Sequence, residues 1–390
     1  MRRWRTMPAL LATTALVLAA CGGGDDDGEL LGGVSNEEEA SEDGDDAGDD
    51  VGDEAGDDAD ADSGGGGELS GTLEGAGATF PDPVFQDWAF EYTNEVQPGV
   101  SINYQSIGSG GGIEQFLLQQ VDFGSSERYL DEEDLAVAAE GRGCEAIQFP
   151  VLFGAVTIAF GDPQFEDLVL DAETIAAIFQ REITTFDDPA IQDLNPDRDL
   201  PGTEIIPVHR SDGSGTTSVF TTYLDHTADN WELGAGTEVQ WPADTVGGQG
   251  NEGVTQGIQQ NEGGLGYVNQ AYAFVNDLPT ALVVNDDGNA VEPTLEATTE
   301  ALEVLEVPDD FRFDILDVGG DGYPIAGTNW IFAYECGYDE TTAAMLKDYW
   351  TWATQDPRAE ELAMELGYAP LGSGLKARVL EAIERINSAE

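Results

Sequence analysis

The stretch that decides the fold is FPVLFGAVTIAF, residues 149–160, a nearly continuous apolar run. A strand covered by helices on both faces has this composition, because neither of its faces meets water. A second run of the same kind, YPIAGTNWIFAYE, spans residues 323–335. The two runs predict long buried strands, one before the middle of the chain and one nearer its end.

Around these runs, segments with strand periodicity alternate with segments with helix periodicity. VSINYQSIG (100–108) reads as a strand and GSGGGIEQFLLQQ (108–120) as the helix after it. TEIIPVH (203–209) and SGTTSVFTTYL (214–224) repeat the pattern. This alternation predicts the α/β fold class.

Residues 1–20 have the pattern of a secretory signal peptide, with three arginines before an apolar stretch that is too short to span a bilayer. LAAC, which ends at Cys21, resembles a bacterial lipobox, in which the cysteine is lipidated. The alternative is an ordinary signal peptide with a chance cysteine. We favour an exported lipoprotein anchored to the outer face of the membrane, because a polar tether follows at once.

The tether spans residues 21–68 and contains 20 carboxylates, with no aromatic residue, lysine or arginine. Such a segment cannot bury enough apolar surface to offset its ordering entropy, and its charges repel one another. This composition predicts that the tether is extended and disordered. A cation-binding arm is the alternative, but the spacing of a calcium loop is absent from its sequence.

Beyond residue 68 the chain carries 58 acidic and 11 basic side chains, a net charge of −47 with histidine neutral. Charges of one sign at this density repel strongly in dilute salt and are screened in molar salt. The composition indicates a salt-loving organism and argues against a nucleic-acid partner.

The remaining two cysteines are Cys144 and Cys336. One pair in an exported chain predicts a disulfide rather than two free thiols. The sequence has two histidines and no CxxC pair, so we expect no metal site. It has neither a dinucleotide-binding nor a P-loop motif, so we expect no cofactor.

Three loops of small residues precede predicted helices: GAGATF (75–80), IGSGGG (107–112) and HRSDGSGTT (209–217). The start of a helix leaves backbone N–H groups unpaired, and its dipole favours an anion. The hydroxyl groups are those of Thr79, Ser109, Ser214 and Thr216, and Arg210 adds a fixed positive charge. The loops therefore predict an anion site.

An enzyme is the competing hypothesis, with Ser109 or Ser214 as nucleophile and His209 or His226 as base. Neither serine lies in a GxSxG motif. His209 adjoins Arg210 on a predicted strand and should point to the opposite face. We therefore expect a protein that is not an enzyme, with an exported phosphoester hydrolase as the alternative.

Five segments, in this order along the chain, resemble the motif series of the PstS family of phosphate-binding proteins: LSGTLEGAGATFPDPVFQDW, VSINYQSIGSGGGIEQFLLQQVDFGSSE, IPVHRSDGSGTTSVFTTYL, GGQGNEGV and GGLGYVNQAYA. The resemblance implies a two-lobed periplasmic-binding-protein fold, type II-like, with the two apolar runs as hinge crossover strands. The implied lobes are 69–154 plus 325–390, and 155–324.

The implied function is high-affinity capture of inorganic phosphate outside the cytoplasm and its delivery to the membrane permease subunits of an ABC importer. We expect a monomer. The alternatives are another tetrahedral oxyanion, sulfate or arsenate, and a cell-wall interaction protein with a vestigial cleft.

The resemblance also implies the phosphate-binding residues, which are Thr79, Phe80, Ser109, Glu127, Arg210, Ser214, Gly215 and Thr216, with Asp212 holding Arg210. Where the family commonly has an aspartate, this chain has Glu127, whose carboxylate should accept the proton of HPO4(2−). The extra methylene of glutamate requires a shift of the loop or of the ligand. The adjacent Arg128 could compete with the ligand for the Glu127 carboxylate.

Overall fold

The computed structural model describes residues 69–302 and 305–389. The predicted signal peptide (1–20), Cys21 and the tether (21–68) lie outside the described residues and stay predictions. The strands are β1 Gly71–Gly77, β2 Val100–Ser106, β3 Phe123–Ser126, β4 Ala146–Phe160, β5 Val169–Leu170, β6 Ile206–Arg210, β7 Val246–Gly248, β8 Gly264–Asn269, β9 Leu282–Val284, β10 Ala290–Val291 and β11 Ala326–Tyr334. The α-helices are α1 Asp82–Glu91, α2 Ser109–Leu117, α3 Glu132–Arg142, α4 Ala172–Phe179, α5 Pro189–Leu194, α6 Gly215–Thr227, α7 Gly250–Gln260, α8 Gln270–Val275, α9 Leu295–Leu302, α10 Glu340–Gln355, α11 Pro357–Glu365 and α12 Ser373–Ile383.

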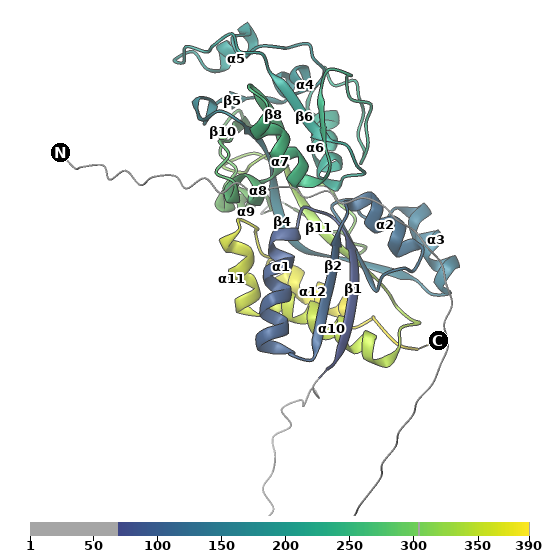
Figure 1. The fold of residues 1–390 in the computed structure, drawn as a ribbon. Helices are drawn as coiled ribbons and strands as arrows, with labels where there is room; N and C mark the ends of the chain where they lie inside the picture. The colour runs from purple at the N-terminus through teal and green to yellow at the C-terminus, as the bar shows by residue number, and fades with distance from the viewer. Residues whose placement is uncertain (1–68, 303–304, 390) are drawn as a thin grey trace, which may run out of the picture. The chain divides into compact units, whose positions relative to one another are not determined.

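The main sheet has eight strands in the order β2-β1-β3-β11-β4-β8-β6-β7. β1, β2 and β3 are parallel to one another, and so are β6, β7 and β8. The two parallel groups are joined through β4 and β11, which pair antiparallel. The α/β, two-lobed fold class is therefore confirmed, and Figure 1 shows the two groups of elements above and below the level where β4 and β11 pass between them.

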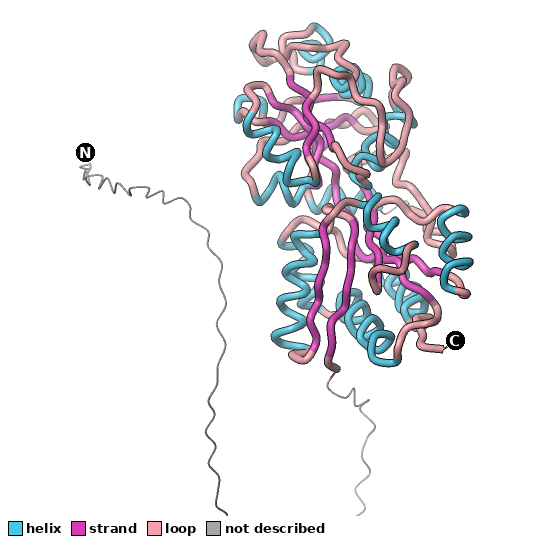
Figure 2. Tube along the Cα trace, turned by 45° about the vertical axis from the view of Figure 1, so that its right-hand side comes forward, coloured by secondary structure: helices cyan, strands magenta, loops and turns pink. Residues whose placement is uncertain are grey.

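The two apolar runs are β4 and β11, as predicted. β4 pairs with β11 along 146–155 and with β8 along 156–160, so one strand serves both halves of the sheet. Every residue of β11 is buried, and in β4 only Ala146 is partly exposed. Figure 2 shows the strands of both halves flanked by helices. The lobe boundaries near residues 154 and 324 stay a prediction.

The parallel strands place their carboxyl ends where loops with functional side chains begin. Thr79 follows β1, Ser109 follows β2, Glu127 directly follows β3, and Arg210 ends β6. In open α/β sheets, ligands bind at such carboxyl ends. A second, three-stranded sheet in the order β10-β9-β5 was not predicted.

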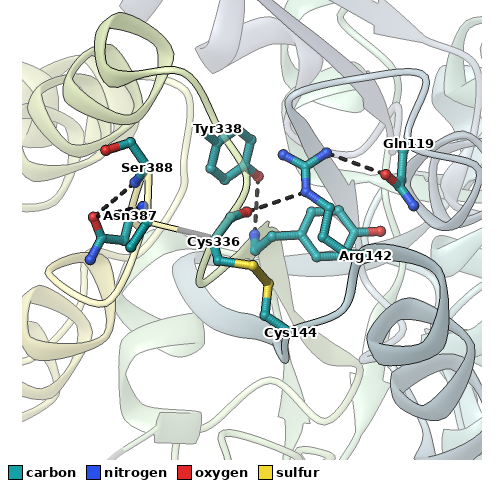
Figure 3. The surroundings of a disulfide bond; sticks show 9 residues. Gln119, Arg142, Cys144, Cys336, Tyr338, Asn387 and Ser388 are labelled. Atoms are coloured by element: carbon teal, nitrogen blue, oxygen red, sulfur yellow. Dashed lines mark hydrogen bonds between the residues drawn. A yellow bond between two sulfur atoms is a disulfide. The ribbon is translucent and has the colours of Figure 1, made fainter.

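The predicted disulfide is present and joins Cys144, just before β4, to Cys336, just after β11, with 6.1 Å between the Cα atoms. Figure 3 shows Arg142 beside it, and the Arg142 Nε donates to the Cys336 carbonyl at 3.2 Å. The guanidinium carbon lies 4.8 Å from the ring centre of Tyr338. The bond therefore fastens the outer ends of the antiparallel pair within one half of the sheet.

In residues 69–302 and 305–389, no helix combines the length and apolar character that crossing a membrane requires. The same residues contain no group of three or more His, Cys, Asp or Glu side chains arranged to hold a metal ion.

Candidate anion-binding site

The structure brings together side chains that were predicted from the three loops and from the family resemblance. Glu127 is 4% exposed, and its Oε2 accepts a hydrogen bond from the Ser109 hydroxyl at 2.5 Å. Its Oε1 accepts one from Thr216 at 3.4 Å. Glu127 and Ser109 follow β3 and β2, whereas Thr216 lies in the first turn of α6, so the carboxylate spans both halves of the sheet.

Burial raises the pKa of Glu127, and the hydrogen bond from Ser109 and the charge of Arg210 oppose this shift. The carboxylate lies directly against Gly215, the first residue of α6. A Cβ built on Gly215 would stand 1.9 Å from Oε2 of Glu127. A glycine at this position therefore makes room for the longer side chain of glutamate beside a helix N-terminus.

Arg210 is 3% exposed, and its guanidinium has a fixed orientation. Its Nε and Nη2 donate to the two carboxylate oxygens of Asp212 at 2.9 and 2.5 Å. Oδ1 of Asp212 also accepts the backbone N–H of Gly250 at 3.0 Å. Such a two-pronged pair leaves the remaining N–H groups of the guanidinium aimed in one direction.

Charge pairing sets the ionisation of Arg210 and Asp212. Burial alone would raise the pKa of Asp212, but the hydrogen bond and charge of Arg210 together lower it. Burial would likewise lower the pKa of Arg210, and Asp212 more than offsets this. The pair is therefore ionised at neutral pH.

The two halves of the sheet touch through glycine-rich backbone. Gly110 N–H donates to the Gly213 carbonyl at 2.9 Å. Gly108 has φ of +90°, and a Cβ there would stand 2.5 Å from Oδ2 of Asp212. The small residues thus permit an approach that side chains would block.

Two tyrosine hydroxyl groups donate hydrogen bonds to the backbone of the first loop (75–80). The carbonyl of Thr79 accepts the Tyr272 hydroxyl at 2.6 Å, and the carbonyl of Phe80 accepts the Tyr368 hydroxyl at 2.5 Å. In the part of the chain that the structure describes, the backbone N–H groups of Phe80 and Gly215 are bonded to no protein acceptor. Both groups are thereby available to an anion.

Ser214 and Arg128 each make hydrogen bonds that the sequence did not predict. Ser214 is the N-cap of α6, and its Oγ accepts the Thr217 N–H at 3.0 Å, which still leaves its hydroxyl proton free to be donated. Arg128 does not compete for Glu127: its guanidinium donates to Asp131 and Asp134, the capping-box residues of α3.

Sequence reasoning missed Asn251 and Tyr267. Asn251, at the start of α7, donates to the Thr79 hydroxyl at 2.8 Å. The Tyr267 hydroxyl accepts the Arg210 backbone N–H at 3.2 Å. The sequence did carry a signal for Asn251, because it stands in the GGQGNEGV segment that contributed to the resemblance.

Neither histidine is placed as a base for a serine nucleophile. The His209 ring stacks on Trp241 at 4.9 Å, and its Nδ1 lies 2.8 Å from the Arg210 carbonyl. His226 pairs with Asp317. The geometry of a serine hydrolase is therefore not formed by these side chains.

Comparison with known proteins identifies the family. A family model described as a PBP superfamily domain matches residues 62–357. A phosphate-binding protein PstS of Xylella fastidiosa is 38% identical over 314 residues, which cover 79% of this chain and 83% of the relative. A PstS of Methanocaldococcus jannaschii is 34% identical over 334 residues, which cover 80% and 85%.

Solved structures share the fold at lower identity. An ancestral soluble variant of the human phosphate binding protein has a TM-score of 0.68 and 20% identity, over 82% of this chain and 99% of its own. A high-affinity periplasmic phosphate-binding protein with bound phosphate has a TM-score of 0.66 and 22% identity, over 79% and 92%. The chain belongs to the PBP superfamily and, within it, to the PstS family of phosphate-binding proteins.

Proposed function

We propose that this protein captures inorganic phosphate outside the cytoplasm and delivers it to the membrane subunits of an ABC importer. The observation that carries the proposal is the buried meeting point of Arg210, Glu127 and the start of α6. It combines a fixed cation, one acceptor and several donors. The names of its relatives agree with this assignment.

Each predicted residue has a role that follows from its chemistry. Arg210 supplies N–H donors that match a tetrahedral oxyanion, and Asp212 holds its fork. Glu127 accepts the proton that phosphate retains at neutral pH. The remaining donors are the hydroxyl groups of Thr79, Ser109, Ser214 and Thr216 and the backbone N–H groups of Phe80 and Gly215.

Glu127 is the group that distinguishes phosphate from sulfate. An ionised carboxylate only accepts hydrogen bonds. Sulfate has no proton at neutral pH, so one of its oxygens would face the carboxylate without a donor between them, which costs several kcal/mol. Arsenate also retains a proton and should be rejected less strongly than sulfate.

The two-lobed arrangement suits reversible capture. The donors come from both halves of the sheet, and two strands, β4 and β11, join these halves. Closure of such halves around a ligand buries it, and opening releases it to a partner. We expect a monomer without catalytic activity, and a generic phosphoester should show no turnover above that of buffer.

The site is tested by calorimetric titration of wild type and Arg210→Ala with phosphate at one fixed concentration of KCl. Wild type should bind one phosphate per chain. The alanine variant should lose roughly 2–5 kcal/mol of phosphate-binding free energy, because removing the guanidinium leaves Glu127 and Asp212 without their buried partner. Wild type that releases no heat with phosphate but binds sulfate would contradict the assignment.

Membrane attachment is a further part of the proposal and rests on the sequence alone. Residues 1–20 would be removed, Cys21 would carry the lipid, and residues 21–68 would act as a leash. Mass spectrometry of the mature N-terminus tests this directly. Cys21→Ala should release the protein into the medium, and a variant that stays in the membrane fraction would rule out the anchor.

The acidic surface is proposed as an adaptation to high salt. Beyond residue 68 only two lysines occur, Lys347 and Lys376. A surface of this charge repels nucleic acids and remains hydrated at salt concentrations where electrostatic repulsion is screened.

A further inference from the structure

We propose that Asn251 is a positioning residue that makes the hydroxyl groups of Thr79 and Thr216 donate to the anion. The inference rests on the proposed phosphate site and deepens it. Asn251 is completely buried and touches both threonines. It would set which way their protons point.

The orientation of the Asn251 amide follows from one backbone contact. Its Oδ1 accepts the N–H of Asn269 at 3.0 Å. A backbone N–H can only donate, so the side-chain atom facing it must be oxygen. The Nδ2 group therefore faces Thr79 at 2.8 Å and Thr216 at 3.3 Å.

Counting lone pairs fixes the direction of the Thr79 hydroxyl. A hydroxyl has one hydrogen and two acceptor positions. Oγ1 of Thr79 receives the Asn251 Nδ2 and also the Asn251 backbone N–H at 3.2 Å. Both acceptor positions are used, and the described residues offer the hydroxyl hydrogen no protein acceptor. The hydrogen is left for a ligand.

Thr216 is arranged in the same way. Its Oγ1 receives the Asn251 Nδ2 at 3.3 Å and the Arg210 Nη1 at 3.4 Å. The hydroxyl hydrogen of Thr216 is then left to be donated, and in the structure it is donated to Oε1 of Glu127 at 3.4 Å. Both threonines thereby become donors, and the Glu127 carboxylate remains as the acceptor.

The fixed donor direction of the Thr79 and Thr216 hydroxyls affects which anion the site accepts. An unconstrained hydroxyl can accept as readily as it donates, and it would tolerate a proton on the anion oxygen that faces it. With both hydroxyls held as donors, neither can accept the anion's proton, and the acceptor that remains beside Thr216 is the Glu127 carboxylate. Asn251 and Thr216 both lie in the half that contains β6, β7 and β8, whereas Thr79 follows β1. The contacts of Asn251 with Thr79 therefore form only when the two halves meet.

The test is a double-mutant cycle that combines Asn251→Asp with Thr79→Val. Aspartate keeps the shape of asparagine and can still accept the Asn269 N–H, but it replaces the Nδ2 donor by an acceptor, so the Thr79 proton turns away from the anion. Phosphate affinity is measured by calorimetry for wild type, both single variants and the double variant. Asn261→Asp, at the other end of the same helix, controls for the added charge.

We expect Asn251→Asp to lower phosphate affinity by about 100-fold when Thr79 is present and by less than about 10-fold when Thr79 is valine, a coupling of the size seen for residues in contact. Asn261→Asp should change affinity by less than twofold. Charge repulsion alone would lower phosphate affinity by the same factor whether residue 79 is threonine or valine. If the two factors agree within threefold, the inference is overturned.

Two further results are informative. If circular dichroism shows that Asn251→Asp does not fold, the same cycle is run with Asn251→Leu, which removes the donor without adding charge, and the same criterion applies. If wild type itself binds no phosphate, the proposed function fails and the inference fails with it. If wild type binds phosphate and the cycle is additive, only the role of Asn251 is wrong.

Discussion

Replacing Gly215 with alanine puts a methyl group where the Glu127 carboxylate lies. The new Cβ would stand 1.9 Å from Oε2 of Glu127 and 2.5 Å from the Ser109 hydroxyl oxygen, whereas real Cβ contacts essentially never fall under 3.0 Å. The carboxylate must therefore retreat by roughly 1 Å, and it is held in place by Ser109. Gly215 is helical, so alanine meets no backbone strain there.

The magnitude follows from overpacking, which typically costs about 1–3 kcal/mol. At 1.4 kcal/mol for each factor of ten, phosphate affinity should fall by about 5- to 150-fold. Glu127 follows β3 and Gly215 begins α6, so the clash arises between the two halves of the sheet. It opposes closure around the ligand rather than folding, and the melting temperature without phosphate should change little.

Calorimetry with phosphate and a thermal melt without phosphate measure the two effects separately. Gly374→Ala is the matched control, because Gly374 also lies in the first turn of a helix and its Cβ would meet nothing within 4 Å. That variant should bind phosphate as wild type does and gain about 0.4–1 kcal/mol of stability. A clash between residue 215 and Glu127 is refuted if Gly215→Ala binds phosphate within twofold of wild type, or if Gly374→Ala loses as much affinity.

Three more predictions concern stability. Reducing the Cys144–Cys336 disulfide, which joins residues 192 apart, should lower the free energy of unfolding by up to about 5 kcal/mol while leaving phosphate affinity unchanged; equal urea midpoints for the oxidised and reduced protein would argue against this. The melting temperature should rise as KCl increases from dilute to molar, where the Debye length is about 3 Å, and a constant melting temperature would exclude repulsion as a determinant. Burial raises the pKa of Glu127 above its usual 4.5, so the folded state holds the proton of Glu127 more tightly than the unfolded state does. The stability that comes from this proton is fully present below pH 4.5 and is lost as pH rises through the folded pKa. Ligand-free Glu127→Gln should therefore melt above wild type at pH 7 and the gap should close toward pH 4, whereas a gap that is constant with pH would show that Glu127 does not titrate as described.

The parts of the fold that sequence could predict are those with strong local signals. The two apolar runs identified β4 and β11 because a doubly covered strand has little polar surface. The loops before α2 and α6 were visible because small residues and hydroxyls are concentrated there. The family resemblance then assembled the loops into one site.

The parts that sequence could not predict depend on contacts between distant residues. Tyr368 bonds the carbonyl of Phe80 from 288 positions away, and no periodicity reports such a bond. Asn251 looked like one polar residue in a glycine-rich segment until its two threonine partners were placed beside it. The small sheet of β5, β9 and β10 was missed because its strands have only two or three residues each.

The most direct test of the central claim is the ratio of phosphate to sulfate affinity in wild type and in Glu127→Gln, measured by calorimetry at neutral pH and one fixed chloride concentration. Wild type should prefer phosphate by orders of magnitude, because its carboxylate accepts a proton that sulfate lacks. The glutamine supplies an N–H donor at the same place, so phosphate should bind more weakly and its advantage over sulfate should narrow. An unchanged ratio would contradict the role of Glu127 as proton acceptor, and a wild type that prefers sulfate would contradict phosphate as the ligand.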